Sequence, residues 1–524
     1  MSSATNQGDI EFKILDCILH HEPIIQYEED SSDGSDSGDM YASPKDQVFV
    51  IQVFGIDSDG KTYSIFINEF QPFFFVKVGD HWTQSYARQF FEHLKGKMGI
   101  QKEGLVSYRL MEKKTLYGFD NNKLHRFVCL KFSNMKALHR VKGMYLKYSE
   151  HTKRRHCRPY CEFKREETTI YESNIPPLLR FFHMQEISPS GWIRIPKKRC
   201  YPLEEKITTC QYEYETKWNF VFPIANKDTQ VPYKICSFDI EASSSHGDFP
   251  LPVKTYKKLA TNIVDHWQEE DIEKEDATQI LTLLCLGAFD YVECHYVDLV
   301  YTKGSHTKEM IEKCISTCLS LREKVETLEK ESKDTQTTID FTPIDEEDTI
   351  SSLHTSSIRR KHTKRDEHSV DIVDILYHST FNYDTKIQYI TALLDRSFPS
   401  IEGDKVTFIG STFLRYGEQE PYKNHCIALN SCSDVDGCEI ESYQTEPEVL
   451  LAWAKLIIEE DPDIIIGYNI FGFDYSFLFQ RALQNHCASS FLEMSRNVDE
   501  ICASRKNGEY KIHESNITIA SGTH

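Results

Sequence analysis

The chain has 524 residues, of which 40% are hydrophobic and 12% aromatic, and this is typical of a globular protein with about two to four domains. Its formal net charge of −21 argues against a general nucleic-acid coat protein, although it allows a local basic face. The sequence contains no run of about 18 apolar residues, and its start, "MSSATNQGDIEFK", lacks the pattern of a signal peptide. We therefore expect a soluble, intracellular protein that does not contact a membrane and keeps its 16 cysteines reduced.

The first part of the chain predicts several strands and one helix. A turn signal, "DSDG" at 57–60, separates two strand-like segments as in a hairpin. The segment "SYARQFFEHLKGKMG" is amphipathic and ends at a glycine, which predicts a helix. Together these elements predict an α+β domain, or a pair of small ones, over residues 1–230, interrupted by a flexible acidic insertion at 27–39. The predicted strands are 12–21, 47–57, 61–68 and 70–80.

A basic segment, "KYSEHTKRRHCRPYCEFKR" at 147–165, has two interpretations. Its lysines and arginines could contact phosphate groups, or the segment could be a solvated loop. Within it, His156, Cys157 and Cys161 are compatible with a metal site. No CxxC pair accompanies them, and incidental cysteines in an exposed basic loop explain them more simply.

Charge-rich sequence fills the middle of the chain, and we expect a charged insertion at about 300–390. Residues 302–331 predict a helix with a few apolar positions among many charges. The stretch at about 325–370 is dense in Lys, Glu, Asp, Ser and Thr, which predicts a mobile surface insertion. Its basic run "RRKHTKR" at 359–365 could act in nuclear targeting or contact phosphate, but such runs are more often solvated loops.

After this insertion the sequence predicts two strands, a helix, a strand and a second helix. The first helix, "TEPEVLLAWAKLIIEE", carries Thr445 and Glu448 at the spacing of a capping box. "DPDIIIGYN" then predicts a buried strand, and "FDYSFLFQRAL" predicts a helix with Asp474 in its first turn. The first two strands are 405–415 and 425–432.

Three carboxylates mark a candidate catalytic site. In "KICSFDIEASSS", strand alternation places Asp239 and Glu241 on one face. Asp474 follows the carboxyl end of the strand "DIIIG", where active sites collect in open α/β sheets and where a helix N-terminus favours a carboxylate. Three such groups stay ionised together only beside a cation, and oxygen ligands favour Mg²⁺ or Mn²⁺. Two such ions about 3.5–4 Å apart would support hydrolysis of a phosphodiester.

Each motif alone has a simpler interpretation. An Asp-x-Glu pair at a strand end is often a solvated edge or part of a salt bridge, and Asn469 could simply stabilise a turn. "GYNIFGFD" is more informative, because it combines Asn469, Phe473 as a hydrophobic wedge and Asp474 as a helix cap in one loop. The prediction of a catalytic site therefore depends on both motifs occurring in this order.

These segments resemble family B DNA polymerases. "SFDIEA" and "GYNIFGFDYSFLFQRA" are similar to the first two exonuclease motifs of that family, and "YESNIPPLLRFFHMQEISPSGWIRIP" is similar to the segment that precedes them. The similarity is greatest to the delta-like replicases of eukaryotes and large DNA viruses. The block "EASSSHGDFPLPVKTYKKLATNIVD" and the long insertion behind it suggest a large nucleocytoplasmic virus.

The resemblance implies a fold and a site. It implies that an α/β RNase H-like (DnaQ-like) 3′–5′ exonuclease domain occupies residues 231–524 and removes mispaired nucleotides from a primer 3′ end. Asp239 and Glu241 would bind the metals and the attacking water, and Asp474 would bind the second metal, with two Mg²⁺ or Mn²⁺ ions in the complete site. Asn469 would help to place the substrate strand, and Phe473 would wedge against its terminal bases, because unstacked bases favour aromatic contacts.

The resemblance also implies what should lie elsewhere. The family's third exonuclease motif, with a Tyr and an Asp, is expected beyond Asp474, and the sequence reaches His524 before it. We therefore expect an exonuclease domain that is incomplete at its C-terminus, so that the isolated chain is an inactive or weak nuclease and cannot polymerise DNA. Its expected partners are primer and template DNA and a C-terminal polymerase half, in cis or as a second chain. A sliding clamp is a further candidate.

The resemblance places the protein in the host nucleus or in a cytoplasmic virus factory. Two alternatives to a proofreading part remain open: a catalytically silent DNA-binding scaffold and a free-standing exonuclease.

Overall fold

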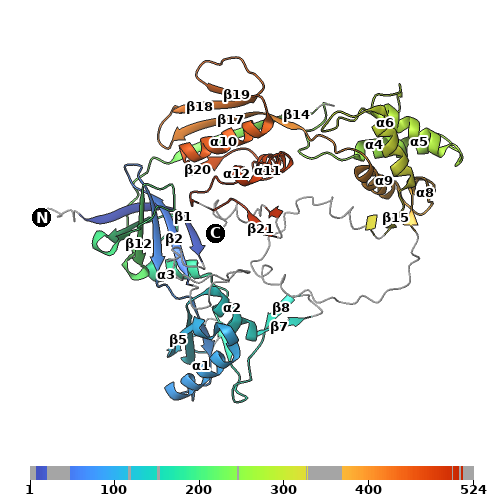
Figure 1. The fold of residues 1–524 in the computed structure, drawn as a ribbon. Coiled ribbons are helices and arrows are strands. Elements are labelled where there is room, and N and C mark those ends of the chain that lie inside the picture. Colours follow the sequence, from blue (N-terminus) through green and yellow to red (C-terminus); the bar gives the residue numbers. More distant parts are fainter. Residues whose placement is uncertain are drawn as a thin grey trace, which may run out of the picture.

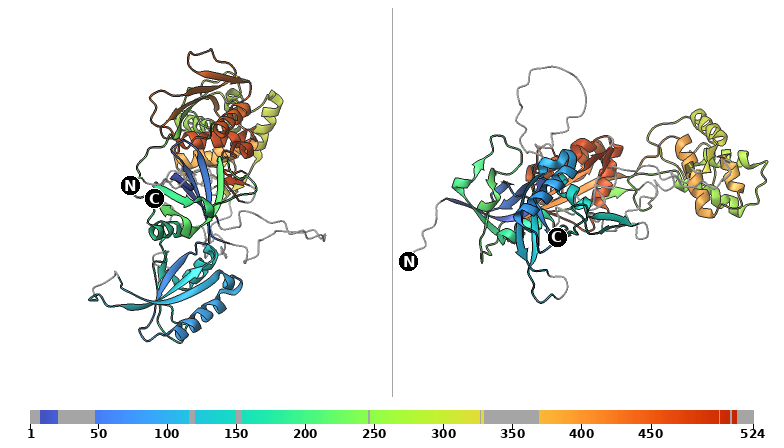
Figure 2. Two further views of the ribbon diagram at one scale, coloured as in Figure 1. Left: turned by 90° about the vertical axis from the view of Figure 1, so that its left-hand side faces the viewer. Right: turned by 90° about the horizontal axis from the view of Figure 1, so that it is seen from below.

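The computed structural model describes residues 8–20, 48–115, 120–149, 154–244, 247–325, 327–328, 369–498, 500–506 and 509–511. The predicted acidic insertion at 27–39, the basic run at 359–365 and most of the predicted insertion at 325–370 lie outside these ranges. Within them, no helix combines the length and the apolar composition needed to cross a lipid bilayer. In Figure 1 the N-terminal sheet with β2 and β12 lies between the sheet with β17 and β18 above it and the body with α1 and β5 below it, and a helical body is set apart to one side. The right view of Figure 2 shows the helical body apart from the rest as well.

The N-terminal residues form a seven-stranded sheet in the order β11-β12-β3-β2-β1-β10-β13. The hairpin predicted at 57–60 is confirmed: Ile56 of β2 pairs with Thr62 of β3, and Gly60 adopts a φ of 82°, which favours glycine. The sheet consists of β1 (Asp9–His20), β2 (Val50–Ile56), β3 (Thr62–Asn68), β10 (Trp192–Pro196), β11 (Tyr201–Pro202), β12 (Tyr212–Lys217) and β13 (Phe222–Pro223). Helix α3 (Pro177–Gln185) and the 3-10 turns η2 (Lys197–Arg199) and η3 (Trp218–Phe220) accompany it.

A second sheet of the N-terminal part has the order β5-β6-β4-β9 and packs against two helices. The helix predicted in "SYARQFFEHLKGKMG" is confirmed as α1. The Thr83 side chain caps its first turn, and Gly99, with a φ of 62°, ends it. Phe90 and Leu94 of α1 are buried against the sheet. The elements are β4 (Phe73–Lys77), α1 (Gln84–Met98), η1 (Gly99–Gly104), β5 (Leu105–Lys113), β6 (His125–Phe132), α2 (Met135–Met144) and β9 (Thr169–Tyr171).

The predicted basic segment contains a small hairpin, β7 (Leu146–Ser149) with β8 (Arg154–Cys157). His156, Cys157 and Cys161 are exposed on or next to it. Among the described residues, no three His, Cys, Asp or Glu side chains gather closely enough to hold a metal ion. A metal site at this hairpin therefore gains no support from the structure.

The later part of the chain forms a five-stranded sheet in the order β19-β18-β17-β14-β20. β14 pairs with β17 antiparallel and with β20 in parallel, so it lies inside the sheet. The predicted strands and helices of this part are present, including the capping box of Thr445 and Glu448. The prediction that the strand in "DPDIIIGYN" is buried is wrong, because it lies at the edge of the sheet and Ile466 is 48% exposed. The elements are β14 (Lys234–Ser243), β17 (Lys405–Arg415), β18 (Lys423–Leu429), β19 (Glu439–Tyr443), α10 (Glu446–Glu460), β20 (Ile464–Ile466), α11 (Asp474–Gln484) and α12 (Ala488–Phe491). A short pair, β21 (Ser504–Lys506) with β22 (Glu509–Lys511), follows.

Between β14 and β17 the chain forms the helical body, which has its own apolar core. The predicted helix at 302–331 is shorter in the structure, because the Thr307 side chain caps α6 at its start and Leu321 is extended after its end. The predicted charged insertion at about 300–390 contains α6, α8 and part of α9 in its described residues, and these helices are packed. The body consists of α4 (Lys257–Glu269), α5 (Ala277–Ala288), α6 (Lys308–Ser320), β15 (Glu323–Lys324), β16 (Ser369–Val370), α8 (Ile372–Tyr377) and α9 (Tyr383–Ser397).

Candidate active site

β14 presents two carboxylates on one face of the five-stranded sheet. Phe238 and Ile240 point into the core, and the alternating residues Asp239 and Glu241 are exposed on the other face. This confirms the predicted alternation. Asp239 lies opposite Gly410 of β17, and because Gly410 has no side chain, the neighbouring strand leaves room beside the Asp239 carboxylate.

The loop before α11 brings Asp474 close to β14. A Cβ atom on Gly467 would lie 2.3 Å from Cγ2 of Ile470 and 2.8 Å from the carbonyl oxygen of Phe238. Only a glycine therefore lets the loop pass over the residue that precedes Asp239. Asp474 is the first residue of α11, where the helix N-terminus favours a negative charge.

Asp239 and Asp474 form a coupled pair of carboxylates. Asp474 is 2% exposed, and its Oδ1 atom is buried without a hydrogen-bond partner. Burial raises the pKa of Asp474 to about 6, and the negative charge of Asp239 adds to this effect. An unpartnered buried oxygen beside a second carboxylate is an unfavourable arrangement that a cation would relieve.

Glu241 does not complete a three-carboxylate cluster in this structure. It lies on the same face of β14 as Asp239, but the described residues include no group of three acidic, His or Cys side chains at metal-binding distance. The structure thus brings together Asp239 and Asp474 and leaves Glu241 exposed nearby. All three offer oxygen atoms, a donor set that suits Mg²⁺ or Mn²⁺.

Asn469 and Phe473 lie in the loop between β20 and α11. Asn469 is exposed and has a φ of 52°, and its carbonyl oxygen accepts hydrogen bonds from the backbone N–H groups of Gly472 and Phe473, both at 3.0 Å. Asparagine tolerates this positive φ better than most residues, which fits the turn-stabilising role that one sequence interpretation gave it. The half-buried ring of Phe473 packs against Phe477, with 5.3 Å between ring centroids. The predicted contacts of Asn469 and Phe473 with substrate remain predictions.

The loop carries two exposed aromatic side chains and has a third beside it, and the sequence analysis did not predict a role for any of them. Tyr468 is 95% exposed, Phe471 is 40% exposed and Phe249 is 72% exposed. The ring of Phe249 lies 5.4 Å from that of Phe473. Exposed aromatic rings near a carboxylate pair are suited to stacking on unpaired bases. The sequence shows the residue types but not their exposure, which the folded loop alone determines.

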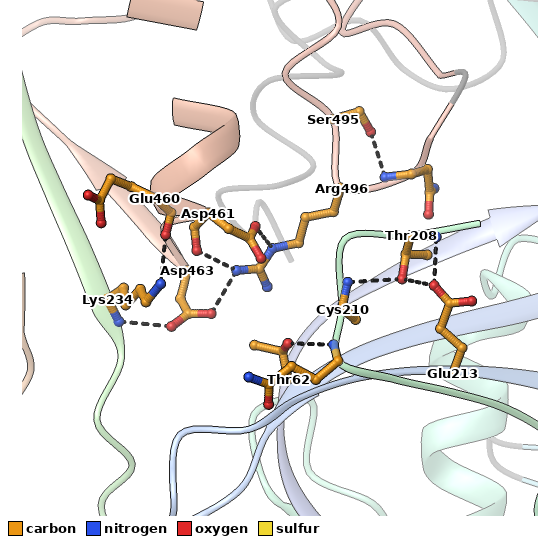
Figure 3. A network of polar contacts seen from close by, with 12 residues as sticks. Thr62, Thr208, Cys210, Glu213, Lys234, Glu460, Asp461, Asp463, Ser495 and Arg496 are labelled. Carbon is orange, nitrogen blue, oxygen red and sulfur yellow. Dashed lines mark hydrogen bonds and ion pairs between the residues drawn. The ribbon is translucent and has the colours of Figure 1, made fainter. Parts of the chain in front are cut away.

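A polar network fixes the start of β14 (Figure 3). The backbone N–H of Lys234 donates to Asp463 Oδ2 at 2.8 Å, and Lys234 Nζ donates to the carbonyl oxygen of Glu460 at 2.8 Å. Arg496 donates from Nε to Asp461 Oδ1 and from Nη2 to Asp463 Oδ1, both at 2.8 Å. Burial alone would lower the pKa of Arg496, and the two carboxylates more than reverse this effect. The network therefore holds β14 and β20 in register below the site.

The same segment joins the five-stranded sheet to the N-terminal sheet. The N–H of Thr209 donates to the carbonyl oxygen of Arg496 at 2.9 Å. Gln52 and Asn497 are buried and exchange two side-chain hydrogen bonds, at 2.8 and 3.1 Å. The N-terminal sheet thus positions the strand that carries Asp239.

Comparisons with known proteins identify the family. The family model for "DNA polymerase family B, exonuclease domain" matches residues 168–290 and 310–523. The DNA polymerase of Phaeocystis pouchetii virus is 38% identical over 90% of this chain and 48% of that protein. The DNA polymerase of Pyramimonas orientalis virus is 30% identical over 86% of this chain and 35% of that protein. The DNA polymerase delta catalytic subunit of Dictyostelium discoideum is 26% identical over 48% of this chain and 23% of that protein.

This chain belongs to DNA polymerase family B and contains the region of its exonuclease domain. The predicted resemblance, including its delta-like character, is confirmed. The chain spans about half the length of the first of these relatives and less of the others. A solved family B DNA polymerase from Pyrobaculum calidifontis matches 96% of this chain and 36% of that chain with a TM-score of 0.40 and 11% identity, which is too weak a similarity to define the fold.

Proposed function

We propose that this chain carries a metal-dependent 3′–5′ exonuclease site that removes nucleotides from the 3′ end of a DNA strand. The observation that carries the proposal is the buried Asp474 carboxylate beside Asp239, with an oxygen atom that lacks a partner. Asp239, Glu241 and Asp474 would hold Mg²⁺ or Mn²⁺, two ions in the complete site. When bound, these ions would activate water and stabilise the leaving oxygen of a phosphodiester.

The strand order supports an RNase H-like fold for the five-stranded sheet. β18, β17 and β14 form an antiparallel meander, and β20 joins β14 in parallel on its other side. Because β20 runs parallel to β14, the loop that follows β20 and precedes α11 lies at the same end of the sheet as Asp239. We propose that residues 231–524 belong to this domain and residues 1–230 to an N-terminal domain.

The protein side chains would place the substrate strand. Asn469 and Phe473 lie in the loop directly before Asp474, and the exposed rings of Tyr468 and Phe471 flank them. These rings could stack on bases that are not paired. The pKa of Asp474 is raised to about 6, so part of its carboxyl groups are protonated near that pH. On binding the cation, Asp474 would release this proton.

In the whole protein this site would proofread. The similar proteins are DNA polymerases, so we propose that the exonuclease acts on a mispaired primer 3′ end during DNA replication, beside a polymerase region in cis or in a second chain. Primer and template DNA are the proposed partners, and a sliding clamp is a further one. A host nucleus or a cytoplasmic virus factory is the proposed location.

The test is digestion of a 5′-labelled single-stranded DNA with Mg²⁺ or Mn²⁺. It is run on this chain alone and with the downstream polymerase half of the Phaeocystis pouchetii virus relative added in trans. We expect shortening from the 3′ end that Asp239→Ala and Asp474→Ala abolish. Asp434→Ala is the matched control, because Asp434 is an exposed carboxylate in the β18–β19 connection, and β17 separates β18 from β14 in the sheet. Digestion that survives Asp239→Ala would contradict the assigned chemistry.

A second candidate function is DNA binding without catalysis. It is favoured by the position of Glu241, which does not join Asp239 and Asp474 in a group able to hold a metal ion among the described residues. Retained single-strand binding with no digestion under either condition would support this scaffold role.

A further inference from the structure

A neck joins the helical body to the five-stranded sheet, as the crossing chain in Figure 1 shows. The N–H of Asp404 donates to the carbonyl oxygen of Leu251 at 2.8 Å, and the N–H of Leu251 donates back to Asp404 Oδ2 at 2.8 Å. The N–H of Glu402 donates to the carbonyl oxygen of Tyr301 at 3.1 Å. The neck is therefore a hydrogen-bonded unit of three chain segments, which are 249–254, 299–303 and 400–404.

The neck is fixed to the helix that begins with Asp474. Arg481 of α11 donates from Nη1 to the carbonyl oxygen of Pro252 at 2.9 Å, and its other nitrogens bind the buried carboxylate of Glu446. A Cβ atom on Gly403 would lie 2.5 Å from Nη1 of Arg481, so the neck and α11 are in close contact. Any feature of the neck consequently has a fixed position relative to Asp474.

The neck contains a cavity of about 330 Å³. Its walls are mainly apolar and include Leu251, Tyr256 and Val300. Charged residues of both signs also line it, namely Lys254, Lys257, Lys258, Asp248, Asp298 and Glu402. The Tyr256 hydroxyl donates to the carbonyl oxygen of Pro399 at 2.7 Å, which fixes that ring in the wall. The size and the mixture of apolar walls with a few charged groups are those of small-ligand sites.

The cavity adjoins the candidate active site. Phe249 lines the cavity, and its ring lies 5.4 Å from that of Phe473, the residue before Asp474. Lys258 forms ion pairs with Asp248 at 3.1 Å and with Asp298 at 3.7 Å, and its side chain is 45% exposed. Lys258 is thus already paired with carboxylates, and a strand that enters the site from this side would meet the exposed Lys257 next to the cavity.

We infer that the neck cavity is a subsite for one unpaired nucleobase of the single strand that enters the candidate active site. A base has apolar faces that suit the aromatic and aliphatic walls and polar edges that suit the lysine and threonine groups among them. Its attached phosphate would remain at the mouth, near Lys257 and Lys258. This inference rests on the proposed exonuclease function, since that function brings a single strand to the site.

The wall that includes Val300 and Tyr301 lies in residues 291–309, which the family model does not match. The subsite is therefore assigned from the helical body of this chain. It is separate from the two exonuclease motifs, which supply Asp239 and Asp474.

The test measures equilibrium binding of a fluorescein-labelled oligothymidine, with Ca²⁺ in place of Mg²⁺ to limit cleavage. We expect Tyr301→Ala and the cavity-narrowing Val300→Phe to weaken binding about tenfold, as loss of one base-stacking contact does. The matched control is Tyr296→Ala, because Tyr296 is 57% exposed in the same segment and does not line the cavity. Circular dichroism of each variant verifies that the helical body is folded.

A second arm uses an oligothymidine with a single 5-iodouracil near its 3′ end. Photo-crosslinking to peptides containing 249–261 or 298–301 would support the subsite. Crosslinks elsewhere, together with affinities of Tyr301→Ala and Val300→Phe equal to that of Tyr296→Ala, would overturn it. If Asp239→Ala abolishes digestion but Tyr301→Ala and Val300→Phe leave the affinity for oligothymidine unchanged, this inference fails and the proposed function stands. If binding depends on the cavity but no digestion occurs, the proposed function fails and the base subsite stands.

Discussion

The five-stranded sheet and the helical body adjoin each other in the chain, but different forces stabilise them. The sheet and its helices bury charged groups: Glu446 is 3% exposed, and Arg481 and Asp474 are each 2% exposed. Among the described residues, none of the buried polar or charged side chains belongs to the helices of the helical body, whose core is apolar. Burying a charged group costs desolvation free energy, but its ion pairs and hydrogen bonds fix the geometry of the groups around it. Apolar packing stabilises the fold and tolerates changes in side-chain shape. The contrast indicates that the sheet is built to hold a site and the helical body to remain folded beside it.

Breaking the buried ion pair should have the largest effect. Arg481→Met leaves the Glu446 carboxylate buried without its cation, and we expect a loss of about 3–5 kcal/mol in the free energy of unfolding. Urea denaturation measures this loss. The matched control is Arg322→Met, because Arg322 forms ion pairs with Asp371 and Asp374 on an exposed side chain and should cost less than about 1 kcal/mol. Equal costs for the two variants would mean that the buried pair has no special role.

Truncating a buried side chain in the helical body should lower the stability of that body and leave the five-stranded sheet unaffected. Leu393 of α9 is fully buried, so Leu393→Ala should destabilise the body by about 2–5 kcal/mol. Hydrogen exchange should accelerate in α4, α6 and α9 and remain unchanged in α10. Leu283→Ala is the control, because Leu283 is 45% exposed and its truncation should change stability by less than about 0.5 kcal/mol. Faster exchange throughout α10 would show that the two bodies unfold as one unit.

Neutralising Asp474 should stabilise the metal-free protein. The folded state holds the Asp474 proton up to a pKa of about 6, and the unfolded state releases it near 3.8, so ionisation at higher pH opposes folding. After allowance for solvent screening, Asp474→Asn should gain about 1–2 kcal/mol at neutral pH. The gain should vanish below about pH 4, where both states are protonated. Denaturation in the presence of a chelator, at neutral pH and below about pH 4, measures this gain in stability. A loss of stability in Asp474→Asn at neutral pH would contradict the burial of an ionised Asp474 beside Asp239.

Removing the cap of α10 should have the smallest effect. Thr445→Ala deletes one half of the capping box with Glu448, and we expect a loss of about 1 kcal/mol. The conservative variant Thr445→Ser keeps the hydroxyl and should restore most of this stability. Thermal unfolding of both variants gives the comparison, and an equal loss in both would mean that the hydroxyl is not the stabilising group.

Local patterns predicted the elements of the sheet well. The alternation that places Asp239 and Glu241 on one face follows from strand geometry, and the Thr445 cap follows from residues three positions apart. Both depend on short-range chemistry that is visible in the sequence. The neighbours of Asp474 are only partly visible, because its burial beside Asp239 depends on the path of the loop through Gly467.

Long-range features could not be predicted in the same way. The helical body was underestimated because its helices carry many exposed charges, and only the folded arrangement shows that Ile311 and Leu393 share a core. The pair of Arg481 with Glu446 joins two helices, and its contact with Pro252 joins a third segment. No spacing rule connects such residues, so the neck and its cavity emerge only from the structure.

The most direct test of the proposed metal binding by Asp239 and Asp474 is a titration of the whole chain with Mn²⁺, followed by electron paramagnetic resonance. Binding should be lost in Asp474→Asn and in Asp239→Asn, because each variant removes one of the two neighbouring carboxylates. The Asp434→Asn variant should bind Mn²⁺ as the unmodified chain does. Unchanged Mn²⁺ binding after either substitution in the pair would contradict the proposed metal site.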